Sequence, residues 1–263
     1  MVKKILKFFY RKIVILLFDI ILNRKSNKTT FLGSSYGGWK FIELDTLNNS
    51  VMISCGVGED ISFDIEMINK YNLNIIFIDP TPRAIDHYKK VLLNLGKKKN
   101  INYSKGGMQN VDSYELSNIK NSQLTLIDKA IWKKSEKKKF YFPKNKNNVS
   151  LSFSNFDNNY RSDTEYIYVN TLSYNEIIND FNLKSLSLIK LDIEGSELEV
   201  IKSILNSKIL PDQILVEFDE LHTYRLNEIK KYYRLHTLLA EMGYISIKIN
   251  EFSNQLYIKK NLL

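Results

Sequence analysis

A glycine turn flanked by acidic residues is the first feature of this 263-residue sequence that could do chemistry. It follows the apolar run 51–54 and contains Gly56 and Gly58, which let the backbone turn tightly and let a ligand approach closely. The fingerprint of a dinucleotide site has a third glycine, where this chain has isoleucine. Glu59 and Asp60 also make the turn acidic where a pyrophosphate needs positive potential. The turn therefore predicts a ligand that carries positive charge.

A carboxylate at the end of the next apolar run narrows the choice of ligand. Asp79 follows the run 75–78 about 20 residues after the glycines, the separation at which an acidic residue accepts the ribose hydroxyls of an adenosine ligand. Together with the acidic turn it favours S-adenosylmethionine over NAD, because the sulfonium and the amino group of S-adenosylmethionine are positive. The alternative is that Asp79 only caps the helix that follows Pro80 and Pro82.

A third acidic segment, Asp192-Ile-Glu-Gly-Ser-Glu197, follows the apolar run 188–191. Ligands of open α/β sheets bind beyond the carboxyl ends of the strands, so Asp192 and Glu194 are candidates to contact a ligand. With Glu217 they also offer oxygen ligands suited to Mg²⁺, which leaves a metal open. Glu197 alone has a simpler interpretation, as a first-turn acid that stabilises its helix.

The elements that position these turns follow from apolar runs and their spacing. Seven short runs rich in β-branched or aromatic residues predict strands at 51–54, 75–78, 124–127, 188–191, 214–218, 244–249 and 255–258. Five segments with helical spacing alternate with them, at 61–69, 84–95, 174–180, 197–206 and 228–242. Strands separated by helices form parallel βαβ units, and the last two strands can form an antiparallel hairpin at the edge. The sequence predicts an α/β fold with one mostly parallel seven-stranded sheet.

These segments resemble the FkbM-type methyltransferases, which are S-adenosylmethionine-dependent O-methyltransferases of natural-product and surface-glycan pathways. The resemblance rests on residues 54–64, 79–83, 169–172, 190–197 and 216–218, and its most specific part is the run that begins at Asp192. It spans roughly residues 36–258 and implies a Rossmann-like class I methyltransferase fold. Members often carry histidine directly after the Glu-Phe of the fifth strand, whereas this chain has Asp219 there and His222 three residues later.

The resemblance implies a role for each candidate residue. The cofactor side would comprise Cys55, Gly56, Val57, Gly58, Glu59, Asp79, Pro80 and Asp128. The glycine turn would face the methionine end, Asp79 the ribose and Asp128 the adenine edge. The acceptor side would comprise Asp192, Glu194, Glu217 and His222, among which a carboxylate or the histidine would accept the hydroxyl proton. The expected reaction is methyl transfer to a hydroxyl of a small molecule or sugar.

The net charge of +9 does not by itself indicate a nucleic-acid partner. Of the 38 basic residues only six are arginine, the residue that contacts phosphates and base edges in bidentate fashion. The lysine-rich segments 97–105 and 133–148 are expected to be solvent-facing loops or edge hairpins. No Asn/Asp-Pro-Pro-aromatic motif follows the fourth strand, which disfavours a nucleic-acid methyltransferase. An inactive membrane-surface scaffold with the same fold is the remaining alternative.

The N-terminal segment differs from the rest of the chain. Residues 13–22 are apolar except for Asp19, and ten helical residues cover about 15 Å, half of a bilayer core, so the segment should not span a membrane. Lys4, Lys7 and Arg11 fall on one helical face and apolar residues on another, which suits an interfacial helix under anionic headgroups. The simpler interpretation, which we favour, is a helix docked on its own domain or on a second subunit.

We therefore divide the chain into residues 1–30, a basic and apolar helix with its linker, and residues 31–263, the methyltransferase domain. Cys55 is the only cysteine, so no intramolecular disulfide forms and a reducing, cytoplasmic setting is favoured. The absence of a small-residue cleavage site after the apolar stretch disfavours secretion. Peripheral contact of residues 1–25 with the inner face of the membrane is the second interpretation of this segment, after docking on protein, and the oligomeric state is left open.

Overall fold

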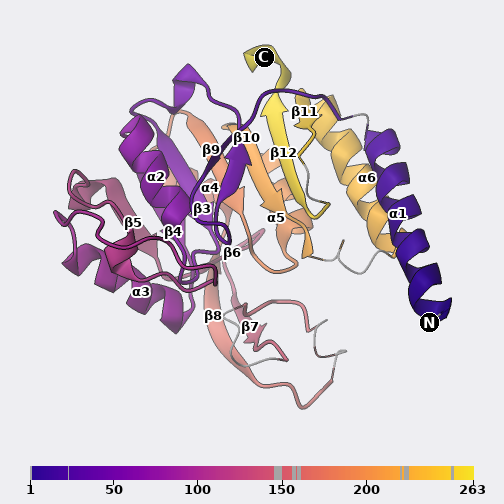
Figure 1. The fold of residues 1–263 in the computed structure, drawn as a ribbon, viewed down its shortest axis with the longest axis horizontal. Coiled ribbons are helices and arrows are strands. Elements are labelled where there is room, and N and C mark those ends of the chain that lie inside the picture. The colour runs from indigo at the N-terminus through magenta and orange to yellow at the C-terminus, as the bar shows by residue number, and fades with distance from the viewer. Residues whose placement is uncertain are drawn as a thin grey trace.

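The computed structural model describes residues 2–22, 24–144, 150–155, 158, 161–219, 221, 225–249 and 252–263, with the backbone alone for 2–8 and 21. Its centre is a seven-stranded sheet with the order β11-β12-β10-β9-β3-β4-β5 (Figure 1). The parallel strands are β3 (Val51–Cys55), β4 (Asn74–Ile78), β5 (Leu124–Ile127), β9 (Leu186–Leu191) and β10 (Pro211–Glu217). The antiparallel edge hairpin consists of β11 (Tyr244–Ile247) and β12 (Asn254–Lys259). The predicted α/β fold, with its mostly parallel sheet and edge hairpin, is confirmed.

The main sheet is buried on both faces, which explains its continuous apolar strands. Successive side chains point to opposite faces, so Met52 of β3 packs in one core cluster and Ile53 in the other. Helices α2 (Ser62–Tyr71) and α3 (Pro82–Leu93) supply side chains to the first cluster. The second cluster receives side chains from α4 (Tyr174–Asp180), α5 (Glu197–Leu205) and α6 (Leu226–Glu241). The predicted elements of the sheet and its helices differ from the observed ones by no more than three residues at either end.

Several smaller elements were not predicted. β1 (Thr30–Leu32) and β2 (Trp39–Phe41) form a short antiparallel pair before the glycine turn. A second sheet contains β6 (Ala130–Ile131), β7 (Lys137–Tyr141) and β8 (Tyr166–Leu172), and Figure 1 shows β7 and β8 projecting from the main body. Short 3₁₀ helices cover Asp45–Leu47, Val111–Ser113, Asn121–Gln123 and Lys260–Leu262. Part of the lysine-rich segment 133–148 therefore forms a strand, β7, which pairs antiparallel with β8.

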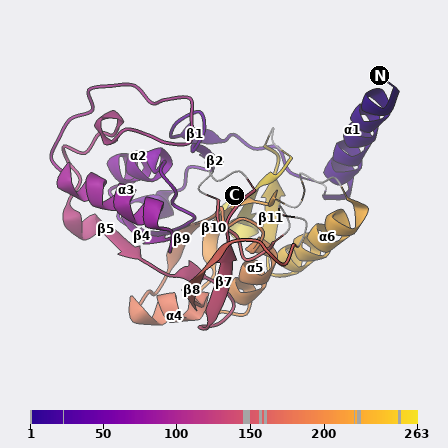
Figure 2. The ribbon, with the colours of Figure 1, turned by 90° about the horizontal axis from the view of Figure 1, so that it is seen from below.

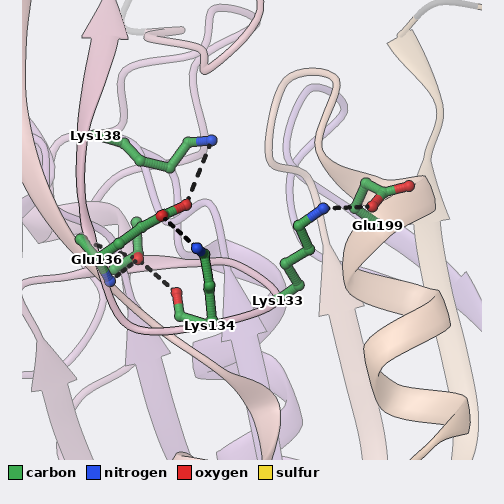
Figure 3. A network of polar contacts seen from close by, with 6 residues as sticks. Lys133, Lys134, Glu136, Lys138 and Glu199 are labelled. Atoms are coloured by element: carbon green, nitrogen blue, oxygen red, sulfur yellow. Dashed lines mark hydrogen bonds and ion pairs between the residues drawn. The ribbon is translucent and has the colours of Figure 1, made fainter.

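The lysines of this segment have partners within the chain. Glu136 accepts ion pairs from Lys134 at 3.0 Å and from Lys138 at 3.8 Å, and Lys133 reaches Glu199 at 3.1 Å (Figure 3). The ammonium of Lys139 lies 4.2 Å from the centre of the Tyr166 ring. The densest run of positive charge in the sequence is thus largely matched by carboxylates and aromatic rings nearby.

Helix α1 (Val2–Leu22) docks on its own domain through one face. Val14, Phe18 and Leu22 are buried, and the ring of Phe18 packs edge-on against Phe252 with 5.0 Å between centroids. Figure 1 shows α1 beside α6 at the edge of the molecule, and Figure 2 shows its N-terminal end projecting away from the domain. Among the described residues no helix combines the length and the hydrophobicity that crossing a membrane requires.

Candidate active site

The glycine turn after β3 lies against the segment after β9. The backbone of Gly56 has φ of 76° and that of Gly58 has φ of 57°, the left-handed region that favours glycine. A β-carbon on Gly56 would stand 1.7 Å from the carbonyl oxygen of Asp192. The Nζ of Lys190, on the neighbouring strand β9, donates to the carbonyl oxygen of Gly56 at 2.7 Å and so holds the turn in place. This backbone crossing requires glycine at position 56.

The carboxylate of Asp79 holds the same turn from the neighbouring strand. One oxygen, Oδ2, accepts from the backbone N–H of Val57 at 2.8 Å and from that of Gly58 at 3.1 Å. The other, Oδ1, accepts from the N–H and the hydroxyl of Thr81 at 2.8 and 2.6 Å. Asp79 therefore braces the glycine turn and fixes Thr81, the residue before α3. No described side chain caps the first turn of α3, so the alternative interpretation of Asp79 as only a helix cap is not supported. The contact of Asp79 with a ribose stays a prediction.

Asp60 connects three segments around the turn. It accepts from the hydroxyl of Ser34 at 2.6 Å, from the N–H of Ser62 at 3.0 Å and from the side-chain amide of Gln109 at 3.0 Å. These bonds hold the loop 33–38 and the segment 104–109 against the start of α2. The loop 33–38 carries Tyr36 to the mouth of the site. Asp60 thus has a structural role, whereas the sequence had indicated only that it makes the glycine turn acidic.

Four carboxyl groups line the cavity at or just beyond the ends of β9 and β10: Asp192, Glu194, Glu217 and Asp219. A third of the Asp192 side chain is accessible, yet desolvation in this enclosed position raises its pKa to about 6, against the lowering effect of Lys190. Desolvation and the nearby carboxylates, Glu194 first, raise the pKa of Asp219 to about 11. Asp219 is therefore protonated at neutral pH, and among the described residues its Oδ2 has no hydrogen-bond partner. Glu194 has φ of 55°, which directs this turn into the site.

A cavity of about 460 Å³ joins the glycine turn to these carboxyl groups, a size typical of ligand sites. Nine predicted site residues line it: Gly56, Val57, Gly58, Glu59, Asp79, Pro80, Asp192, Glu194 and Glu217. Two do not. The side chain of Cys55 is fully buried in the core, and Asp128 is exposed outside the lining, so the expected adenine contact gains no support from the geometry. His222 lies outside the described residues.

Sequence reasoning missed Tyr36, Lys190 and Asp219, which also line the cavity. The sequence could have indicated Lys190, because it is the one charged residue of a strand in which all six residues are buried. Its Nζ lies 3.7 Å from a carboxylate oxygen of Asp192 and 5.5 Å from the centre of the Trp39 ring. Asp219 left a weaker signal, since it occupies the position at which the FkbM-type pattern often has histidine. Tyr36 sits in a glycine- and serine-rich loop that the sequence alone does not place.

The lining fits S-adenosylmethionine. The glycine cradle gives a ligand access to the backbone. Three carboxylates, Glu59, Asp79 and Asp192, lie around the turn and outnumber the two cations paired with them, Arg83 with Glu59 and Lys190 with Asp192. A ligand with a positive sulfonium and a positive amino group is favoured in such a field. Within the described part of the chain, no three His, Cys, Asp or Glu side chains form a group suited to a metal ion, so the Mg²⁺ option gains no geometric support.

Comparisons with known proteins identify the family of this chain. Residues 42–246, which are 205 of the 263 residues, match the family model of the methyltransferase FkbM domain. A solved structure, M. jannaschii TYW2 in complex with AdoMet, is 11% identical and aligns over 89% of this chain and 86% of that chain with a TM-score of 0.30, too low to show a shared fold. A comparison with curated protein sequences gave no match. The chain belongs to the FkbM family of S-adenosylmethionine-dependent methyltransferases.

Proposed function

We propose that this enzyme methylates a hydroxyl oxygen of a small molecule or sugar that is neutral or positively charged. The observation that carries the proposal is the set of carboxyl groups at the acceptor end of the cavity, Asp192, Glu194, Glu217 and Asp219. An acceptor with a phosphate or carboxylate would meet like charge there, which costs free energy in an enclosed site. Hydroxyl groups instead donate hydrogen bonds to carboxylates.

The cofactor is assigned to the glycine side of the cavity. Gly56, Val57 and Gly58 would hold the methionine end, with Glu59 near its amino group and Asp79 near the ribose. When bound, S-adenosylmethionine supplies an electrophilic methyl group on a positively charged sulfur. The side chain of Lys190 keeps the turn and the acceptor segment in register through Gly56 and Asp192.

Asp192 is the proposed general base. Its pKa of about 6 lies near neutral pH, so the group is ionised when the enzyme works and is still basic enough to take a proton. The acceptor oxygen would form the new bond to the methyl carbon as the bond from that carbon to sulfur breaks and S-adenosylhomocysteine is left. The hydroxyl proton would pass to the Asp192 carboxylate. Asp219, protonated at neutral pH, can donate a hydrogen bond to a second oxygen of the acceptor. His222 remains a second candidate for the base.

The same charges argue against nucleic acid as the acceptor. The backbone phosphates would approach Glu194 and Glu217, while the lysines of residues 133–139 are engaged by Glu136, Glu199 and aromatic rings. A role in surface-glycan or natural-product synthesis in the cytoplasm is the setting that the family pattern supports. An inactive scaffold would need the fold but not an acidic cavity of ligand size, so the cavity favours an active enzyme over a scaffold.

An acceptor panel tests the proposal. The purified full chain is incubated with S-adenosylmethionine and matched acceptors, each offered as a neutral sugar, as its amino sugar and as its sugar phosphate. We expect S-adenosylhomocysteine to form with the neutral or amino forms and to fall by about tenfold or more with the phosphate, since one buried charge repulsion exceeds about 1.4 kcal/mol. A preference for the phosphate would overturn the assignment.

A further inference from the structure

We infer that the outward face of α1 binds an anionic membrane surface, independently of the acceptor proposed above. Four large apolar side chains lie three or four residues apart along this face, which places them in one stripe. They are Phe9, Ile13, Leu16 and Ile20, with exposed fractions of 58%, 56%, 61% and 64%. Leu17, beside the stripe, is 47% exposed. A continuous apolar stripe of this kind on a water-soluble surface marks an interaction site.

The opposite face of α1 packs against the domain and therefore keeps the apolar stripe facing solvent. Val14, Phe18 and Leu22 are 2–3% exposed, and Phe18 and Leu22 belong to a core cluster of the domain. Rotating the stripe inward would expose these three side chains and separate Phe18 from Phe252. The carboxylate of Asp19 is bonded to Arg24 and lies 3.9 Å from Lys248, which ties the end of the helix to the domain. The outward stripe is therefore a property of the fold.

The charge of the segment identifies the partner. Residues 1–25 contain seven basic residues and one acidic residue, so their side chains carry a net charge of 7 − 1 = +6. The basic residues are Lys3, Lys4, Lys7, Arg11, Lys12, Arg24 and Lys25. The acid, Asp19, is neutralised by its ion pair with Arg24. Arg11 and Lys12 are exposed on the same helix as the stripe. An apolar stripe on a segment of net positive charge matches a lipid surface with anionic headgroups.

The dimensions agree with a helix that lies in the headgroup region. An α-helix of 21 residues is about 30 Å long, and an interfacial helix buries its apolar face by about 5–10 Å. Figure 2 shows α1 projecting from the body of the protein, so the domain does not obstruct its N-terminal end. A second copy of the chain is a poorer partner, because pairing two such stripes would bring two segments of +6 together.

Vesicle sedimentation tests the inference with the full chain. We expect the wild type to sediment with vesicles of equal parts phosphatidylglycerol and phosphatidylcholine and to bind pure phosphatidylcholine more weakly. The double variant Leu16→Asn with Ile20→Asn should lose about tenfold or more of its affinity for the mixed vesicles. The matched control is Leu93→Asn with Leu263→Asn, which removes exposed leucines elsewhere (82% and 51% exposed) and should bind as the wild type does.

A second variant separates charge from apolar contact. Replacing Arg11 and Lys12 by glutamine should weaken binding to the anionic vesicles, and added salt should weaken the wild type similarly. Unchanged binding of S-adenosylmethionine verifies that each variant is folded. A wild type that fails to sediment, or a Leu16→Asn, Ile20→Asn variant that binds fully, would overturn the inference. So would a wild-type dimer that this double variant converts to monomer without any binding of vesicles, because the stripe would then be a subunit interface.

Discussion

The carbonyl oxygen of Asp192 occupies the space where a β-carbon on Gly56 would stand, 1.7 Å away. The two residues follow adjacent parallel strands, β3 and β9, and the N–H of Asp192 donates to the carbonyl oxygen of Cys55 at 3.1 Å. The chain leaves β3 toward one edge of the sheet and β9 toward the other, which is the position where open α/β sheets bind ligands. The glycine turn after β3 and the segment after β9, to which we assign the cofactor and the acceptor, are thus in direct contact.

Gly56→Ala should abolish most cofactor binding. The new methyl group would collide with the Asp192 backbone and displace the turn, so we expect affinity for S-adenosylmethionine to fall by at least about tenfold in calorimetric titration. Gly96→Ala is the matched control. Gly96 also has a positive φ, 85°, but a β-carbon there meets no described atom within 4 Å. Equal losses in the two variants would mean that backbone strain alone, and not the crossing with Asp192, explains the effect.

Asp79→Ala should weaken cofactor binding and loosen the glycine turn. The substitution removes the acceptor of the Val57 and Gly58 amides, and hydrogen bonds to a charged group contribute about 1.5–3 kcal/mol. We expect a loss of about tenfold or more in affinity, with faster amide exchange at Val57 and Gly58 even without cofactor. Unchanged affinity together with faster exchange would show that Asp79 braces the turn without contributing to the site.

Asp192→Asn should remove turnover while leaving cofactor binding nearly unchanged. The amide keeps the size of the side chain but cannot accept the hydroxyl proton, so kcat should fall by about 100-fold or more. In the wild type, kcat should rise with pH through about 6 and then level off, because only the ionised carboxylate acts as a base. A variant with normal turnover would leave Glu194, Glu217 and His222 as candidates for the base.

Asp219→Asn should be tolerated at neutral pH and should stabilise the protein at alkaline pH. The folded state raises the pKa of Asp219 to about 11, above its unfolded value, so the folded protein holds the extra proton across the neutral range. The free energy of unfolding contributed by this group therefore falls as pH rises, by at most about 1.4 kcal/mol per pH unit, and asparagine removes that loss. Urea unfolding of both proteins in acidic and alkaline buffer measures the difference. Parallel pH dependence of wild type and variant would contradict a protonated Asp219.

Phe18→Ala should destabilise the domain, whereas Ile20→Ala should not. Phe18 is 2% exposed and packs on Phe252, and truncating such a buried ring costs about 3–5 kcal/mol. Ile20 lies two residues away and is 64% exposed, so its truncation should change the free energy of unfolding by about 0.5 kcal/mol or less. Similar stabilities of the two variants in urea would mean that α1 is not docked in solution.

The main sheet could be predicted because its strands are buried on both faces and therefore appear as continuous apolar runs, such as the one in β9. The strand β7 has the sequence Lys-Lys-Lys-Phe-Tyr and no such run, so the sequence alone does not indicate it. Its lysines contact Tyr166 and Tyr168 of β8, a strand distant in sequence. Helix α1 is apolar on two faces, so periodicity could not determine which face docks.

Part of the candidate site could likewise be predicted from the sequence, and part could not. Its glycines and acids lie in short segments whose spacing is local, and most of them line the cavity. The raised pKa of Asp219 and the position of Tyr36 depend on neighbours distant in sequence, such as Glu194 for the first and the bond between Ser34 and Asp60 for the second. Such effects arise only when the chain is folded.

Transfer of an isotopically labelled methyl group tests the central claim most directly. The full chain is incubated with S-adenosylmethionine labelled with carbon-13 in its methyl group and with the neutral or amino acceptor selected from the panel, and the product is examined by carbon NMR. The account predicts a single labelled carbon bonded to an oxygen of the acceptor, formed by the wild type and reduced by about 100-fold or more in Asp192→Asn. Label bonded to nitrogen or recovered on nucleic acid, or a chain that binds S-adenosylmethionine and transfers label to none of the acceptors, would contradict it.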